Sequence, residues 1–445
     1  MPADLIQHPF MSHAGLAETN AEAMVAAMLA FELGLAEVQE ARGAVPLGTS
    51  RAMHRILEAK AFDVESIANG IGNGGNAAIP FVKQGRALLP EELKRYFHQG
   101  ATSQDVLDTA LMLLLKPRLA RLDALLERCR KASIDLMTGH EGTVMVGRTL
   151  MQQALPITFG VKVAHWALGL EQARRRLKAL AATGLSVQLG GAVGVHSGWG
   201  EEGLDFMDAL AERLGLAAPV LPWHTGRQPI HALGTALDAA AGAAEKLALD
   251  VALLTQTEIG EVSEPAGEGM GESSSMPHKR NPVRCALIRG AARQVHGHTT
   301  VLLNASAQPL ERGLGEWHAE WSPLIDSALL LEGALEQAAA LLEGLEVHPE
   351  AMRRNLAITG GGIMAEPVSR LLAPVVGQAA AKRISAEAAD TARLQGVSYA
   401  EALEAHPEVR GKLDPEALHR VTDPAFYLGS SQAQVRRAIA WLEAE

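Results

Sequence analysis

The segment HALGTALDAAAGAAEKLALDVALLTQTE, residues 231–258, contains no proline and carries the clearest structural signal in the chain. Apolar residues recur along it at alternating spacings of four and three: Leu233, Leu237, Ala240, Ala244, Leu247, Val251 and Leu254. This spacing places them on one face of an α-helix, as in the seam of a helix bundle. A helix of about 28 residues is about 42 Å long. The segment therefore predicts a bundle of long helices and favours a bundle shared between subunits.

Two further segments repeat this rhythm. The first contains Leu111, Leu114, Arg118, Leu122, Leu125 and Cys129, and we expect Pro117 to bend its helix. The second runs from Leu324 to Leu345. Strand signals are scarce, and only Thr143–Val146 and Gly190–Val195 read as short extended pieces. These patterns predict an all-α fold with a central bundle.

The domain boundaries are set by turn residues. The Gly/Thr/Ser turn at Ala101 precedes the long helices, and His348-Pro349 opens a new helix after Val347. We therefore predict an N-terminal helical domain over residues 1–101, the long-helix bundle over 102–346 and a C-terminal helical domain over 347–445.

Composition excludes several classes of function. The chain has 445 residues, of which 48% are hydrophobic but only 4% aromatic, so its core is rich in Ala, Leu and Val. The formal net charge of −11 argues against a nucleic-acid partner or an acidic membrane surface. Two cysteines, Cys129 and Cys285, give no disulfide framework. We see no signal peptide or membrane span and expect a cytoplasmic protein.

Metal and nucleotide sites are not indicated. His296 and His298 are two residues apart, His224 and His231 are seven apart, and neither pair has converging Cys, Asp or Glu. The glycine run at 267–271 lacks the Lys-Ser/Thr of a P-loop. We therefore expect no metal and no cofactor.

One loop carries most of the chemical signal. It reads GESSSMPHKRNP, residues 271–282, with further glycines just before it. Glycine, serine and proline disfavour regular structure and favour an anion-handling loop. Ser273 and Lys279 are candidates to act together, because a serine hydroxyl needs a nearby cation and donors to become a base. A solvated surface loop is the simpler interpretation of such a composition.

The whole loop resembles the signature loop of the fumarase/aspartase superfamily. Two other segments resemble its remaining signatures: HQGATSQD at 98–105 and GRTLMQQALP at 147–156. The resemblance spans essentially the whole chain. It implies a three-domain, all-α, fumarase/aspartase-like fold and a homotetramer whose active sites are shared between subunits.

The chain departs from the superfamily at two positions. Its lyases usually carry a histidine directly after the Arg-Thr pair, where this chain has Leu150. They also carry a glutamate five residues beyond the signature asparagine, where this chain has Ala286. Both halves of the His–Glu pair are thus missing together, which indicates one change of chemistry.

A carboxylate that acts as nucleophile or leaving group needs no such pair. Its conjugate acid has a pKa of about 4, so it departs without a proton, whereas hydroxide or an amine needs a positioned acid. Lactonisation of a muconate fits this requirement. The segments 148–160, 100–110 and 309–321 also resemble the bacterial 3-carboxy-cis,cis-muconate cycloisomerases of the protocatechuate branch of the β-ketoadipate pathway.

That resemblance implies a small tricarboxylate substrate and a set of residue roles. Ser273 is the expected proton donor and acceptor at the α-carbon, and Lys279 the cation that stabilises the aci-carboxylate intermediate. Arg148 and Arg312 are candidate carboxylate clamps, although each is also a candidate for a structural ion pair. The other expected substrate-binding residues are His98, Thr102, Ser103, Thr149, Gln152, Ser274, Met276 and Asn281.

Two alternatives stay open. Adenylosuccinate lyase shares the Met-Pro-His-Lys-Arg-Asn-Pro form of the loop, but it should need an acid at position 150. A catalytically inactive structural homologue would also lack the His–Glu pair. Retention of Ser273, Lys279 and Asn281 in one loop argues against that second alternative.

Overall fold

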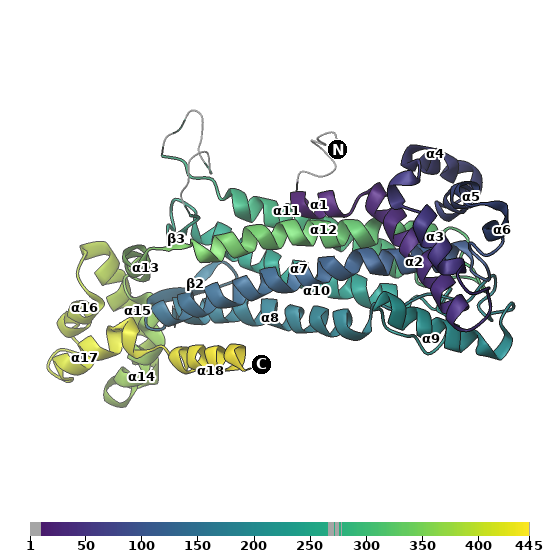
Figure 1. The fold of residues 1–445 in the computed structure, drawn as a ribbon. Helices are drawn as coiled ribbons and strands as arrows, with labels where there is room; N and C mark the ends of the chain where they lie inside the picture. The colour runs from purple at the N-terminus through teal and green to yellow at the C-terminus, as the bar shows by residue number, and fades with distance from the viewer. Residues whose placement is uncertain (1–9, 266–270, 272–275, 277, 445) are drawn as a thin grey trace. The chain divides into compact units, whose positions relative to one another are not determined.

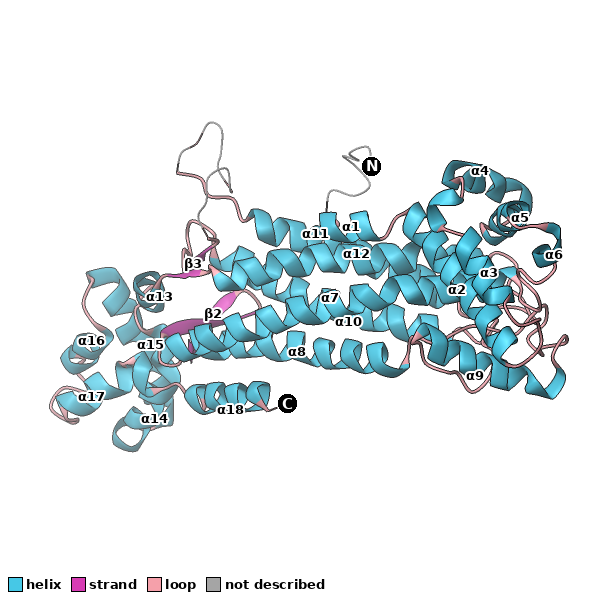
Figure 2. Ribbon diagram, in the orientation of Figure 1, coloured by secondary structure: helices cyan, strands magenta, loops and turns pink. Residues whose placement is uncertain are grey.

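The computed structural model describes residues 10–265, 271, 276 and 278–444. Helices account for most of the described chain and strands for little of it, so the prediction of a helical fold is confirmed (Figure 2). The chain separates into two compact units, each built from three segments. Unit 1 comprises Met1–Glu127, Gln172–Glu245 and Leu287–Gln337, and unit 2 comprises Arg128–Glu171, Lys246–Ala286 and Ala338–Glu445.

Five long helices, labelled in Figure 1, contribute residues to both units. They are α7 (Ser103–Gly139), α8 (Phe159–Thr183), α10 (Gln228–Leu254), α11 (Val283–Asn304) and α12 (Glu316–Glu343). Each of the three segments predicted as long helices corresponds to one of these, although α10 and α12 end at Leu254 and Glu343, before the predicted ends at 258 and 345.

Helix α10 confirms the predicted seam. It runs from Gln228 to Leu254. Pro229 lies in its first turn, where the N–H group that proline lacks would have no intrahelical acceptor. The seven apolar residues predicted to share one face are all buried. Helix α7 likewise continues through Pro117. Next to that proline, Arg118 is buried and its Nη1 donates to Glu332 at 2.9 Å.

The remaining helices of unit 1 are shorter than these five and mostly N-terminal. Asn20 caps α2 by accepting from the N–H of Ala23 at 2.9 Å, and Phe31, Phe81 and Phe97 are buried in the apolar core that these helices share with α9. The helices are α1 (His13–Glu18), α2 (Ala21–Ala41), α3 (Thr49–Ile56), α4 (Val64–Gly74), α5 (Ala78–Leu88), α6 (Glu91–Lys94) and α9 (Gly203–Leu214), with 3-10 turns at Ala59–Ala61 and Gly200–Glu202.

The C-terminal helices pack around a second apolar core in unit 2 that includes Val368, Leu372, Ile384 and Leu403. They begin at Pro349, with His348 as the N-cap residue, where the sequence predicted a new helix. The three-domain division itself stays a prediction. These helices are α13 (Pro349–Leu356), α14 (Ala365–Val376), α15 (Gln378–Gln395), α16 (Tyr399–Ala405), α17 (Pro415–Thr422) and α18 (Ser431–Glu443), with 3-10 turns at Gly362–Met364 and Pro424–Phe426.

Unit 2 also holds two small antiparallel sheets. Strands β1 (Val144–Thr149) and β2 (Gln152–Thr158) form a hairpin, and β3 (Val262–Ser263) pairs with β4 (Glu346–Val347). The strand predicted over Thr143–Val146 is therefore confirmed and longer than expected. The strand predicted over Gly190–Val195 is wrong, because Gly191 and Gly194 have positive φ angles of 71° and 82° and this segment forms turns.

A buried ionic network lies near the start of α7 in unit 1. Arg227 donates to Asp108 at 2.7 Å and to Glu320 at 2.5 Å, and its guanidinium stacks 4.7 Å from the Trp223 ring. Trp317 Nε1 also donates to Asp108, at 3.0 Å. Burial raises the pKa of Glu320 to about 7, although the hydrogen bonds from Arg227 act in the opposite direction.

This raised pKa predicts a pH-dependent stability. Protonated Glu320 is compatible with burial, and its contribution to stability is fully present below the pKa of about 4.5 that it has in the unfolded chain. This contribution is lost as the pH rises through 7 and the buried side chain ionises. In Glu320→Gln the side chain stays neutral, so the variant should gain up to about 3 kcal/mol relative to wild type between pH 4.5 and 8. Urea unfolding of both proteins across this range measures the difference.

The exposed Glu350 provides the control, because Glu350→Gln should leave the pH dependence of wild type unchanged. A difference between wild type and Glu320→Gln that is the same at every pH would show that Glu320 does not titrate in this range.

Candidate active site

Thr102 and Ser103 lie at the start of α7 in unit 1. The backbone N–H of Thr102 donates to Asp105 Oδ2 at 3.0 Å, and Arg312 Nη1 donates to Thr102 Oγ1 at 3.1 Å. Arg312 Nη2 donates to the carbonyl of Ala192 at 2.9 Å. Thr102 Oγ1 accepts the bond from Arg312 and donates to no described residue, so its hydroxyl proton can serve an external acceptor. The structure thus joins Thr102 and Arg312, which the sequence placed in one site from segments 210 residues apart.

Asp105 holds this region together. Its carboxylate is fully buried and accepts five hydrogen bonds, all at 2.9 or 3.0 Å. A buried carboxylate needs such donors to offset the loss of water. The donors are the backbone N–H groups of Thr102, Gly190 and Gly191, Gln188 Nε2 and His224 Nε2. Two of these bonds also explain why Gly190–Val195 forms no strand, since its first two N–H groups bind Asp105.

His98 lies four residues before Thr102 and binds a buried acid. Its Nδ1 lies 2.6 Å from Oε1 of Glu32, a residue of α2 whose side chain is fully buried. His98 has a positive φ angle of 63°, which is costly for a residue other than glycine. Glu32 could not be predicted as its partner, because nothing in the local sequence links it to position 98.

Arg148 is occupied within its own chain. Its two terminal nitrogens donate to the two oxygens of Glu261 at 2.9 and 2.8 Å. Glu261 is fully buried and also accepts from Asn355 Nδ2 at 2.7 Å. Of the two roles predicted for Arg148, a carboxylate clamp and a structural ion pair, this bidentate pair corresponds to the second. A contact between Arg148 and substrate stays a prediction.

Thr149 and Gln152 pair across the β1–β2 hairpin, and both are exposed. The two residues between them, Leu150 and Met151, form the turn with positive φ angles of 49° and 65°. A two-residue turn of this kind normally uses Asn-Gly or Asp-Gly. Leu150 is 97% exposed, so the residue that replaces the superfamily's histidine projects from the tip of the hairpin.

Of the signature loop at 271–282, the structure describes residues 271, 276 and 278–282. Ser273 and Ser274, both predicted site residues, lie outside them. Asn281 N–H donates to the carbonyl of Gly271 at 2.9 Å, and Lys279 N–H donates to that of Met276 at 3.0 Å. The Lys279 side chain is exposed and makes no ion pair with any described residue. Its ammonium is therefore available to a ligand.

The described candidates form two groups. His98, Thr102, Ser103 and Arg312 belong to unit 1; Arg148, Thr149, Gln152, Met276, Lys279 and Asn281 belong to unit 2. The hydrogen bonds and strand pairing given above join members within each group. Asp105 and Glu32 are additions that the structure makes to the first group.

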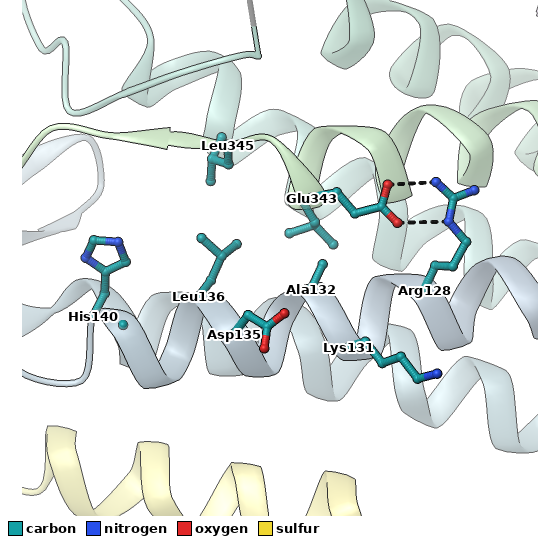
Figure 3. Close-up of a pocket in the computed structure, with 10 residues that line it drawn as sticks. Arg128, Lys131, Ala132, Asp135, Leu136, His140, Glu343 and Leu345 are labelled. Atoms are coloured by element: carbon teal, nitrogen blue, oxygen red, sulfur yellow. Dashed lines mark hydrogen bonds and ion pairs between the residues drawn. The ribbon is translucent and has the colours of Figure 1, made fainter.

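One cavity of about 400 Å³ in unit 2 contains none of these residues (Figure 3). It lies between the end of α7 and residues 342–345, where Arg128 and Glu343 form a bidentate ion pair at 2.9 and 2.7 Å. It is not part of the candidate site. Among the described residues, no three His, Cys, Asp or Glu side chains are grouped to hold a metal ion. No described helix is long and apolar enough to span a membrane.

Comparisons with known proteins agree with the signature segments. A family model described as lyase matches residues 13–297, and one described as adenylosuccinate lyase C-terminus matches residues 361–438. A 3-carboxy-cis,cis-muconate cycloisomerase from Pseudomonas aeruginosa is 42% identical over 416 residues, which are 93% of this chain and 91% of that protein. A nitrosuccinate lyase from Streptomyces davaonensis is 42% identical over 428 residues, 94% of this chain and 90% of that protein.

A solved structure extends this likeness to three dimensions. The 3-carboxy-cis,cis-muconate lactonizing enzyme from Pseudomonas putida superposes with a TM-score of 0.92 at 38% identity and covers 99% of both chains. The resemblance inferred from the three signature segments is confirmed: this chain belongs to the lyase family that includes the 3-carboxy-cis,cis-muconate cycloisomerases.

Proposed function

We propose that the protein converts 3-carboxy-cis,cis-muconate to 4-carboxymuconolactone, a step of the protocatechuate branch of the β-ketoadipate pathway. The observation that carries the proposal is the joint absence of the His–Glu pair at Leu150 and Ala286 in a chain that keeps Ser273, Lys279 and Asn281. The relatives from Pseudomonas aeruginosa and Pseudomonas putida that carry this activity in their names support it.

The chemistry of the bond that forms or breaks explains the missing pair. In lactonisation a substrate carboxylate adds to a carbon–carbon double bond, and in the reverse direction the same carboxylate leaves. With a conjugate acid of pKa about 4, it needs no proton donor. An exposed leucine at position 150 supplies no acid, so the residues present fit this reaction and do not fit the release of an amine or hydroxide.

The expected mechanism places charge on a second carboxylate. As the new C–O bond forms, electrons move onto the conjugated carboxylate and produce an aci-carboxylate. Lys279, Asn281 and the hydroxyls of Thr102 and Ser103 stabilise that charge. Ser273 then delivers a proton to the α-carbon. The free hydroxyl proton of Thr102, whose oxygen is held by Arg312, supports its role as a donor.

Binding a tricarboxylate requires several cations. Arg312 is anchored to Thr102 and Ala192 through one N–H of each terminal nitrogen, which leaves three of its five N–H groups for a substrate carboxylate. Lys279 is exposed, and His98 lies four residues before Thr102. These three residues supply positive charge at the proposed site, while Arg148 is bound to Glu261.

A second candidate is the cleavage of nitrosuccinate, which the relative from Streptomyces davaonensis specifically favours. A nitro group leaves as nitrite, a weak base like a carboxylate, so this reaction also proceeds without an acid at position 150. An adenylosuccinate-lyase-like reaction fits less well, because its nitrogen leaving group is more basic. An inactive homologue fits less well because the signature loop keeps its polar residues.

We further propose that the protein is a homotetramer whose active sites combine residues of different subunits. Two observations support this arrangement. The candidate residues are divided between unit 1 and unit 2. Leu310 and Leu314, which flank Arg312 in the sequence, are also 85% and 90% exposed, as is typical of apolar side chains on surfaces that another protein covers.

The loss of ultraviolet absorbance on adding purified protein to 3-carboxy-cis,cis-muconate tests the function. We expect rapid loss of conjugation without added metal, and no turnover of nitrosuccinate or adenylosuccinate. Ser273→Ala and Lys279→Met should each lower kcat by at least about a hundredfold, because a proton-transfer group or the main counter-charge is lost. Both variants should unfold like wild type. Efficient turnover of nitrosuccinate instead of the muconate would establish the second candidate.

The shared site predicts complementation between inactive variants. In the proposed site Thr102 and Lys279 come from different subunits, so tetramers that mix Thr102→Val and Lys279→Met chains should contain some sites with neither substitution. Unfolding and refolding the two proteins together should restore a fraction of the wild-type activity, whereas each refolded alone stays inactive. Sedimentation should show a tetramer. A fully active monomer would rule out the shared site.

A further inference from the structure

His98 has one occupied and one open nitrogen. Nδ1 lies 2.6 Å from Glu32 Oε1, and Nε2 makes no hydrogen bond within the described part of the chain. The His98 side chain is 16% exposed, whereas that of Glu32 is fully buried. The Nδ1 edge of the imidazole is therefore held by a buried acid, while Nε2 has no hydrogen-bond partner among the described residues.

The surroundings of Glu32 favour a positively charged partner. Glu32 lies on α2 among core residues such as Phe31, Leu33 and Leu35. Its Oε2 is buried and has no hydrogen-bond partner among the described residues. A carboxylate in such a place is strongly destabilising unless a cation pairs with it. His98 is the partner that the structure supplies.

The backbone around His98 is fixed on both sides. Arg86 Nη2 donates to the carbonyl of Phe97 at 3.1 Å, and Gln39 Nε2 donates to that of Gln99 at 2.8 Å. These bonds hold the segment while His98 adopts its unfavourable φ of 63°. Strain that neighbouring contacts maintain in this way is typical of residues with a functional position.

The charged groups that face His98 come from three helices. Glu32 of α2 and Asp105 of α7 favour the imidazolium, and Arg86 of α5 opposes it. Burial alone would lower the pKa of His98, but the charge and hydrogen bond of Glu32, with a smaller effect of Asp105, raise it above its ordinary value. A histidine held in this state gives up its proton reluctantly and suits anion binding better than acid catalysis.

We propose that Glu32 is a positioning residue that keeps His98 as an imidazolium with its Nε2–H open, so that His98 binds one carboxylate of the substrate next to Thr102 and Arg312. This His–Glu pair differs in role from the pair missing at Leu150 and Ala286, because it supplies a fixed positive charge and no proton. The carboxylate assigned to His98 rests on the function proposed above, whereas the charge of His98 does not.

Glu32→Gln tests this role, because glutamine preserves an acceptor for Nδ1–H but removes the charge. We expect KM for 3-carboxy-cis,cis-muconate to rise about tenfold at pH 8, in keeping with the loss of a charge-assisted hydrogen bond, and less at pH 6. The value of kcat should change by less than about twofold, since charge stabilisation at the reacting carbon is left in place. Steady-state kinetics between pH 6 and 9 measure both constants.

The sign of the pH effect separates this role from a structural one. As the pH rises, kcat/KM should fall when His98 loses its proton. This fall should begin at a lower pH in Glu32→Gln than in wild type. Equal loss at every pH would contradict the proposal. Glu332→Gln is the matched control, since Glu332 is also fully buried and paired with a cation, Arg118. It should lose stability without a change in the pH dependence of KM.

An NMR titration of His98 without substrate tests the role of Glu32 independently of the proposed function. In protein labelled at histidine, the His98 resonance is assigned by its absence from His98→Gln/Glu32→Gln, a double variant that avoids leaving a buried charge unpaired. The His98 resonance should titrate at lower pH in Glu32→Gln than in wild type. If it titrates at the same pH in both, Glu32 does not set its charge. If wild type fails to consume the muconate, the proposed function fails while this titration still decides the role of Glu32.

Discussion

The buried carboxylate of Asp105 is the interaction on which the rest of unit 1's candidate site depends. An ionised group without water must be surrounded by donors, and Asp105 obtains five from three separate segments. Satisfying it brings the first turn of α7, the turn at Gly190–Gly191 and His224 to one point. Thr102 is then held by its own N–H to Asp105 and by its oxygen to Arg312. The geometry of the proposed donors therefore follows from the electrostatic needs of a residue that does not itself contact substrate in our proposal.

The same physical rule recurs through the molecule. Asp108 and Glu320 share Arg227, Glu332 is paired with Arg118, and Glu261 takes both terminal nitrogens of Arg148, with every one of these acids buried. In each case the acid lies where a helix or strand must be fixed against another segment of its unit. A core poor in aromatic side chains packs through small aliphatic residues. These directional ion pairs add the positional precision that such packing supplies less well.

The spacing of apolar residues predicted helices correctly where local sequence determines the structure. It failed where contacts with residues far along the chain determine the conformation. The α10 seam was predicted because burial of Leu233 and its partners follows from spacing alone. Gly190–Val195 was misread as a strand because its N–H groups bind Asp105, 85 and 86 residues away. The β1–β2 hairpin lacked a turn signal, since Leu150 and Met151 replace the usual Asn-Gly. Arg148 could be named from its motif, but its partner Glu261 lies 113 residues further along.

The missing His–Glu pair separates two tasks that a lyase usually performs together. One is to stabilise the charge that develops on a carboxylate, the task we propose for Lys279, Asn281 and the hydrogen-bonded pair Thr102–Arg312. The other is to protonate the departing group, and neither Leu150 nor Ala286 can do so. A protein that keeps the first task and drops the second is suited to leaving groups of low basicity. A carboxylate and a nitrite both meet that condition, so the acid's absence defines the class of reaction. In the proposed site Arg312, His98 and Lys279 then favour the substrate with more carboxylates, because each additional buried anion requires its own partner.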